Sequence, residues 1–137
     1  MGLERFISAQ EGLYARALEE IKKGKKQSHW MWFIFPQIAG LGHSTTAKFY
    51  GIANLEEAKS YMAHPVLSRH LIEISEALLK IENKTATEIL GTPDDMKLRS
   101  SMTLFAHTEN TNPVFKEVLR KFFSGIHDEL TLKILKQ

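Results

Sequence analysis

The chain has 137 residues, 43% of them hydrophobic and 25% charged, with a formal net charge of +2 at pH 7. These values are ordinary for a globular protein, and we expect a single domain over residues 1–137. The lack of cysteine excludes disulfides, thiolate nucleophiles and metal sites built on sulfur. No apolar run approaches the roughly 20 residues of a membrane span, and the start lacks a secretory-signal pattern. We therefore expect a cytoplasmic protein that does not enter a membrane and, with so small a charge, does not bind nucleic acid.

The first part of the chain predicts a long helix and a short one. Apolar residues recur every three or four positions between Leu3 and Ile21, which predicts one amphipathic helix that ends before Gly24. Residues 44–50 predict one or two helical turns after a glycine-containing loop. Residues 31–35 are the least certain segment, because their composition also suits a β-strand.

The middle of the chain predicts two consecutive helices. Asn54 followed by Glu57 is a capping pair for a helix over residues 55–63. Pro65 suits the first position of the next helix, whose near-continuous apolar stripe extends to about Glu82.

The last third repeats the same start and stop signals. Thr85 with Glu88 predicts a short helix that Gly91 ends, and Thr92 followed by Pro93 predicts an N-cap and first residue for another. The remaining two helices are expected from Pro113 to about Phe123 and, with Asp128 as N-cap, through Leu135. No segment shows sustained alternation of apolar and polar residues. The sequence therefore predicts a compact all-α bundle of about six to eight helices with no substantial sheet.

Residues 26–37 form an aromatic segment, which holds both tryptophans of the chain. A buried indole N–H needs a hydrogen-bond partner, so a core built for packing alone would more readily use aliphatic residues here. We predict that Trp30, Trp32 and Gln37 line a ligand pocket. Four lysines between residues 22 and 26 could attract a phosphate, although they also suit the C-terminal turn of a helix.

The second polar segment lies on the helix expected from Pro93. Lys97, Arg99 and Ser100 could together bind a phosphate, because arginine offers two parallel donors and serine a hydroxyl. The alternative is a surface ion pair, for which Asp95 is the expected partner of Arg99. Asp95 itself is either a helix-capping acid or a catalytic carboxylate.

The six histidines show no metal-binding spacing, and we predict neither a metal nor a cofactor. His29 and His43 flank the aromatic segment and the glycine loop, which makes them the better candidates for proton transfer. Of these we predict His29, together with Asp95, as catalytic.

Three stretches of sequence, SHWMWFIFPQ, AHPVL and PDDMKLRSSMTLF, resemble a bacterial all-helical family of unknown function that is sometimes labelled calpastatin-like. The resemblance spans nearly the whole chain and implies a compact helical fold without an established activity. The inhibitor calpastatin is a disordered polypeptide, whereas this chain has capped helices and an apolar core, so the label carries no functional weight. The order of the segments is also loosely similar to that of helical ADP-ribose-processing N-glycosidases, although no catalytic residue of that family aligns with this chain.

Two functions follow from these observations. The first is a pocket for a phosphorylated small molecule such as a nucleotide or an ADP-ribose derivative, with metal-independent hydrolase or N-glycosidase activity as the accompanying hypothesis. The second is a protein–protein interaction module without catalytic activity, in which the aromatic segment is a binding surface for another protein or for a second copy in a homo-oligomer.

Overall fold

The computed structural model describes residues 2–137 and contains helices only. Ten helices follow one another along these residues: α1 (Glu4–Glu11), α2 (Tyr14–Lys22), α3 (Met31–Ile34), α4 (Thr45–Phe49), α5 (Leu55–Ala63), α6 (Pro65–Leu79), α7 (Ala86–Leu90), α8 (Asp94–Ala106), α9 (Val114–Phe123) and α10 (Glu129–Leu135). The all-α prediction is therefore confirmed. None of the helices in residues 2–137 combines the length and apolar character that crossing a bilayer requires.

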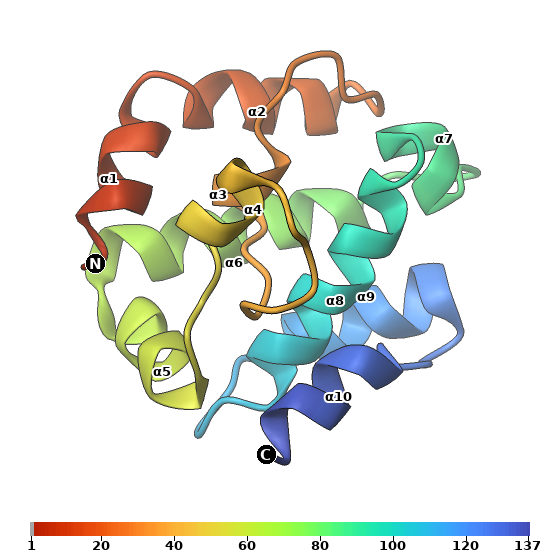
Figure 1. Ribbon diagram of the computed structural model, residues 1–137. Coiled ribbons are helices and arrows are strands. Elements are labelled where there is room, and N and C mark those ends of the chain that lie inside the picture. Colours follow the sequence, from red (N-terminus) through yellow and green to blue (C-terminus); the bar gives the residue numbers. More distant parts are fainter. Residues whose placement is uncertain (1) are drawn as a thin grey trace.

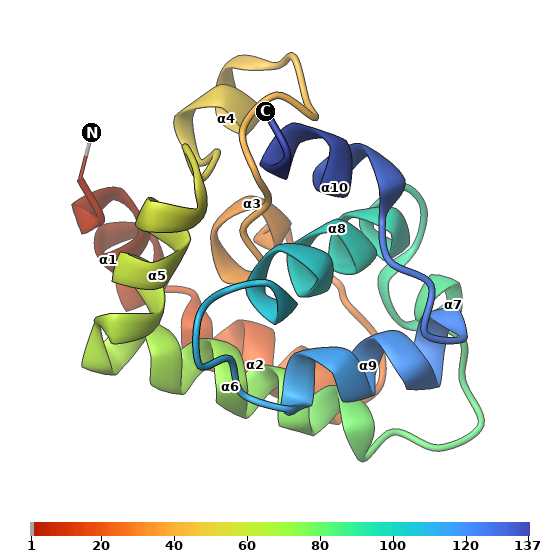
Figure 2. The same cartoon turned by 90° about the horizontal axis from the view of Figure 1, so that it is seen from below.

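Helix α8 lies in the middle of the molecule (Figure 1). Seen from below, it lies between α10 and α4 on one side and the pair α6 and α9 on the other, with α1 and α5 at one end (Figure 2). Nine of its thirteen residues are buried, on more than one face of the helix. This agrees with contacts to α9, α7, α10 and α5, because a helix covered on several sides needs no single apolar stripe.

The core is one cluster of buried side chains to which α1 through α9 contribute, except α4, which has no buried residue. Its largest fully buried members are aromatic: Trp30, Tyr61, Phe6, Phe35, Phe105 and Phe115. Rings at 5–6 Å centroid distances, such as Phe6 with Tyr61 at 5.2 Å and Tyr61 with Phe105 at 5.3 Å, connect α1, α5 and α8. Such ring pairs add specific geometry to the area that they bury.

The predicted N-caps of three helices are confirmed. Asn54 Oδ1 accepts a hydrogen bond from the Glu57 backbone N–H at 2.9 Å. Thr85 and Glu88 form the predicted capping box, and the Asp128 carboxylate accepts from the Thr131 N–H at 3.0 Å. Each cap satisfies a backbone donor that the first helical turn cannot satisfy itself, which is why these starts are legible in the sequence.

The single helix predicted between Leu3 and Ile21 is wrong, because the chain turns between α1 and α2. Gly12, a weak helix former, ends α1, and its N–H donates to the carbonyl of Gln10. After the turn, Tyr14 packs flat on His70 of α6, with ring centroids 3.6 Å apart. The break allows the apolar faces of α1 and α2 to be buried against different neighbours. Together with the four- and five-residue helices α3 and α4, it raises the helix count above the predicted six to eight.

Two further boundaries differ from the prediction. Thr92 is not the N-cap of α8; Pro93 occupies that position and no side chain caps the helix, which begins at Asp94. Helix α6 ends at Leu79 instead of Glu82, and Lys121 of α9 donates to the free carbonyl of Leu79 at 2.7 Å. A tertiary contact thus satisfies this helix end, and sequence signals do not reveal such contacts.

Residues 31–34 are the short helix α3, so the alternative of a strand in the aromatic segment is excluded. The only strand-like feature in residues 2–137 is an isolated parallel bridge between Ile38 and Ile52. The Ile52 N–H donates to the Gln37 carbonyl at 2.8 Å, and the Ala39 N–H donates to the Ile52 carbonyl at 2.7 Å. This bridge fixes the chain where it leaves the aromatic segment and approaches α4.

Candidate functional site

The first tryptophan of the aromatic segment is interior. Trp30 is 0% exposed, and its Nε1–H donates to Glu20 Oε1 at 2.9 Å. Glu20 also accepts from the Ser28 hydroxyl at 2.6 Å and from the backbone N–H groups of Gln27 and Ser28 at 2.8 and 3.0 Å. Burial alone would raise the pKa of the Glu20 carboxyl, but these donors outweigh it and lower the pKa to about 2. Trp30 thus anchors the segment and does not line a pocket.

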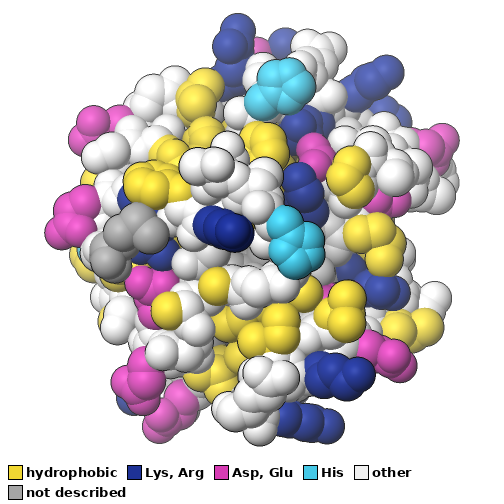
Figure 3. Space-filling view, in the orientation of Figure 1, with side chains coloured by type: hydrophobic (Ala, Val, Ile, Leu, Met, Phe, Trp, Pro, Cys, Tyr) yellow, Lys and Arg dark blue, Asp and Glu magenta, His cyan; other side chains and the backbone are white. Residues whose placement is uncertain are grey.

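The second tryptophan borders a cleft of about 770 Å³. The cleft lies between the loop before α4, the outer edge of α8 and the start of α10. The predicted site residues that line it are Trp32, Gln37, Lys97, Arg99 and Ser100; the other lining residues include His43, Met96, Ile126, His127, Asp128 and Leu130. The face that carries α4, α8 and α10 shows hydrophobic, basic and histidine side chains close together (Figure 3). The structure therefore brings five of the eight predicted residues to one place.

Lys97 connects the two predicted halves of the site. Its Nζ lies 4.5 Å from the centroid of the Trp32 ring and 3.5 Å from Asp94 Oδ1. A cation over an indole face is attracted by the ring quadrupole. Asp94 also pairs with Lys26 at 2.9 Å, so the aromatic segment and α8 are joined by ion pairs as well as by packing.

Arg99 is incompletely paired in the cleft. Its side chain is 24% exposed, and its buried Nε has no hydrogen-bond partner. The Arg99 Nη2 atom lies 3.7 Å from Asp128 Oδ1, which is close enough for an ion pair but too long for a hydrogen bond. The expected pairing of Arg99 with Asp95 is not found. A buried donor without a partner is costly unless an acceptor from a ligand or from solvent completes it, and the Nε of Arg5 is left unpaired in the same way.

The two predicted catalytic residues do not reach the cleft. Asp95 Oδ2 accepts from the Thr87 hydroxyl at 2.6 Å and its Oδ1 from the Met96 N–H at 2.8 Å, so its carboxylate joins α8 to α7. His29 is exposed and is not among the residues that line the cleft. Ser100 does line it, but its hydroxyl donates to the Met96 carbonyl at 3.2 Å within the helix.

Four other titratable residues line the cleft: His43, His127, Asp128 and Glu129. His127 packs edge-on against His107 at a centroid distance of 5.1 Å. Burial, followed by the neighbouring His107 and Lys116, lowers the pKa of His127, which favours a neutral imidazole that can accept a proton. The sequence predicted His43 as a candidate for proton transfer and Asp128 only as a helix N-cap. The sequence carries no signal that Asp128 would meet Arg99, because the contact joins positions 29 residues apart through the packing of α10 on α8.

The rim of the cleft is apolar. Met96, Ile126 and Leu130 are 44%, 58% and 60% exposed, and they are half of the six large hydrophobic side chains exposed in residues 2–137. All three line the cleft. Exposed apolar side chains that gather at one place indicate a binding surface more strongly than scattered ones do.

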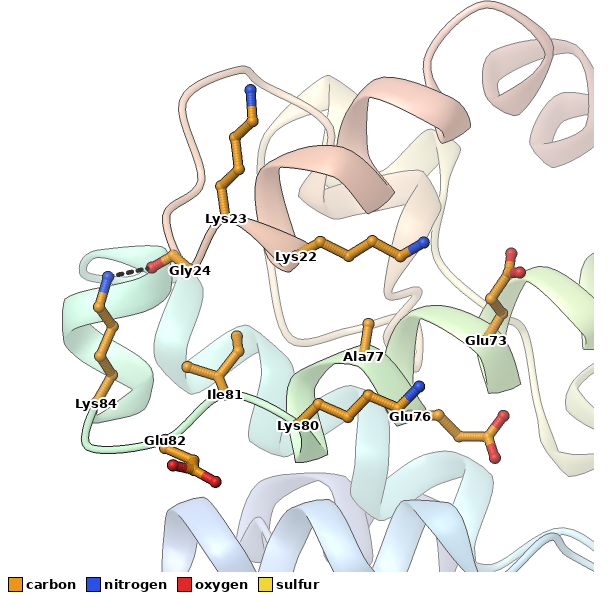
Figure 4. A pocket seen from close by; sticks show the side chains of 10 residues that line it. All are labelled: Lys22, Lys23, Gly24, Glu73, Glu76, Ala77, Lys80, Ile81, Glu82 and Lys84. Atoms are coloured by element: carbon orange, nitrogen blue, oxygen red, sulfur yellow. Dashed lines mark hydrogen bonds between the residues drawn. The ribbon is translucent and has the colours of Figure 1, made fainter.

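A second cavity, of about 670 Å³, lies between the C-terminal ends of α2 and α6 (Figure 4). Four lysine and three glutamate side chains surround Ala77 and Ile81. Lys84 Nζ donates to the Gly24 carbonyl at 3.0 Å, and among the described residues no ion pair joins the lysines of this cavity to its glutamates. None of the predicted site residues lines this cavity, whereas five of them line the cleft beside Trp32, so that cleft is the stronger candidate site.

Fold and site together define a class: an all-helical protein with a cleft that carries both basic and acidic side chains, between α8, α10 and the loop that precedes α4. Residues 1–135 match the family described as protein of unknown function DUF1810, and the chain belongs to this family. The chain is also similar to the conserved hypothetical protein Rv1873 from Mycobacterium tuberculosis, whose crystal structure is known at 1.38 Å resolution. The two share 43% sequence identity over 98% of this chain and 96% of the other, with a TM-score of 0.96. A search of curated proteins gave no match. The family of unknown function is thus confirmed, whereas nothing in these matches carries the calpastatin label.

Proposed function

We propose that the cleft binds a phosphorylated small molecule of the nucleotide or ADP-ribose type. The observation that carries the proposal is Arg99, a largely buried guanidinium whose Nε has no partner. Lys97 supplies a second cation in the same cleft. A guanidinium binds phosphate through two parallel hydrogen bonds, which would fill donors that the protein leaves free.

The accompanying hypothesis of hydrolase or N-glycosidase activity needs groups that exchange protons with the ligand. Asp95 is committed to Thr87, and His29 lies outside the cleft. His127 and Asp128 lie beside Arg99, and His43 lies on the loop that borders the cleft. We therefore assign the acid–base role in this hypothesis to these three residues, since a catalytic group must come within hydrogen-bond distance of its proton.

The test is a thermal-shift titration with AMP, ADP-ribose, NAD and sugar phosphates. A ligand that binds only the folded protein raises the melting temperature, by an amount that grows with its concentration. We expect a saturable rise with at least one phosphorylated compound, its loss in Arg99→Ala, and its retention in Arg120→Ala, which removes an exposed arginine of α9. No rise with any phosphorylated compound, or an equal loss in both variants, would overturn the proposal.

A protein–protein interaction module is the second candidate, and the apolar rim favours it. Met96, Ile126 and Leu130 are exposed side by side, which suits the edge of a protein interface. Sedimentation velocity over a range of concentrations tests whether the protein self-associates, which the interaction module allows and the small-molecule pocket does not require. A homo-oligomer that dissociates in Ile126→Ser/Leu130→Ser supports the module, whereas a monomer at all concentrations removes self-association from this candidate.

A further inference from the structure

Asp128 places a carboxylate oxygen in the cleft that accepts no hydrogen bond from the described residues and has only an ion-pair contact to Arg99. Its Oδ2 accepts from the Thr131 N–H at 3.0 Å and from the Thr131 hydroxyl at 2.6 Å, which fixes the carboxylate at the start of α10. No hydrogen bond within residues 2–137 uses Oδ1, whose nearest cationic atom is Arg99 Nη2 at 3.7 Å. One oxygen is thus held rigidly by the protein while the other remains an open acceptor beside the proposed phosphate site.

This placement limits what can bind to Arg99. An anion held by the Arg99 guanidinium lies within a few ångströms of the Asp128 carboxylate, and two negative charges repel strongly at that range where water is partly excluded. A carboxylate has only acceptors, so a ligand benefits if it brings a donor to Oδ1. A bare phosphate brings none when fully ionised. A sugar phosphate brings hydroxyl groups, covalently attached a short distance from its phosphate.

We propose that the cleft selects phosphates attached to a polyhydroxylated sugar, with Asp128 Oδ1 accepting a hydrogen bond from a sugar hydroxyl. Arg99 and Lys97 hold the phosphate of the same molecule. The inference rests on the proposed function, because it needs a phosphate at Arg99, and it assigns recognition of the sugar to Asp128. The apolar rim by itself predicts a preference for a phosphate attached to a hydrocarbon. The inference predicts the opposite preference.

Two probes of equal carbon number separate these preferences: ribose 5-phosphate, which carries hydroxyls, and n-pentyl phosphate, which carries none. Titration calorimetry with the intact chain measures both affinities. We expect ribose 5-phosphate to bind at least tenfold more tightly. In Asp128→Asn the ratio should fall to about threefold or less, and inorganic phosphate should bind several-fold more tightly than to the wild type, because a negative charge is replaced by an amide that can donate.

Asp128→Asn should fold, because asparagine is a good N-cap and its Oδ1 can accept from the Thr131 N–H. Asp128→Ser is the second variant, since serine also caps helices but is too short to reach the ligand; it should lose the same selectivity. Tighter or equal binding of pentyl phosphate by the wild type, or an unchanged ratio in both variants, overturns the inference and leaves phosphate binding intact. If ribose 5-phosphate, n-pentyl phosphate, inorganic phosphate and every nucleotide fail to bind, the proposed function and this inference are both overturned.

Discussion

Two neighbouring regions of the molecule differ in how completely their charged side chains are paired. In the anchor, formed by Glu20, Lys26 and Trp30, the Glu20 carboxylate accepts four hydrogen bonds and Lys26 is paired with Asp94. In the cleft, the Arg99 guanidinium has only a 3.7 Å contact to Asp128 and an unpaired Nε. A buried charge that the fold satisfies completely is explained by the fold. A partly buried charge that lines a cleft and is incompletely paired, as Arg99 is, is a candidate for binding a ligand.

The largest expected effect compares the two tryptophans that belong to these regions. Trp30→Ala should lower the free energy of unfolding by about 3–5 kcal/mol, because it empties a fully buried site and removes the donor to Glu20. Trp32→Ala, at a half-buried position, should cost less than about 1.5 kcal/mol. Urea unfolding followed by far-ultraviolet circular dichroism measures both. Similar losses would mean that Trp32 is as much a structural residue as Trp30.

A second comparison uses two arginines. Arg5 donates to the Gly51 carbonyl at 3.0 Å and pairs with Glu57 at 3.1 Å, so Arg5→Met should destabilise the protein by about 3 kcal/mol. Arg99→Met should change the free energy of unfolding by less than about 1 kcal/mol, since Arg99 makes only a 3.7 Å contact to Asp128 and its side chain is more exposed than that of Arg5. Denaturant unfolding at neutral pH checks the pair. A loss at Arg99 that matches the loss at Arg5 would contradict a ligand-binding role.

Glu20 and Glu19 provide a matched test of the anchor. Glu20→Gln keeps the shape but removes the charge that accepts four hydrogen bonds, and we expect a loss of about 2 kcal/mol. Glu19→Gln removes only a fully exposed pair with Lys23, so its stability should be close to that of the wild type. Thermal and urea unfolding of both variants measures the contrast. Equal stabilities of the two variants would show that the anchor does not depend on the charge.

The smallest expected effect is the pH dependence of the difference in stability between the wild type and Glu20→Gln. The pKa of Glu20 is lowered in the folded protein from its ordinary 4.5 to about 2, so the unfolded chain takes up the proton first. The stabilisation by the carboxylate is therefore complete above pH 4.5 and is lost as the pH falls toward 2. The difference in unfolding free energy between the wild type and Glu20→Gln should shrink over this range in urea titrations. A difference that is independent of pH would contradict the lowered pKa.

Local signals in the sequence were sufficient for most of the fold. The caps at Asn54, Thr85 and Asp128 satisfy backbone donors within a few residues, so they can be recognised without knowing the tertiary structure. The division between α1 and α2 could not be predicted in this way. It depends on where Tyr14 finds a partner, and that partner is His70, on a helix more than fifty residues away.

The candidate site was predictable in its composition but not in its assembly. Lys97 and Arg99 are close in sequence, and residue type alone points to an anion. Trp30 and Trp32 have the same residue type and lie two positions apart, yet Glu20 holds the first inside while the second reaches the cleft. Asp128 comes to Arg99 only because α10 packs on α8. Such assignments depend on tertiary contacts, for which helix periodicity gives no information.

The contact between Lys97 and Trp32 makes the fluorescence emission of Trp32 sensitive to what binds in the cleft. The chain has two tryptophans, and the one in the anchor is shielded from solvent, so its emission provides a constant background. The other has an ammonium group 4.5 Å from the centre of its ring. An anion that draws Lys97 away changes the electric field at this indole and therefore shifts its emission. Occupancy of the cleft can thus be followed by intrinsic fluorescence, without attaching a dye.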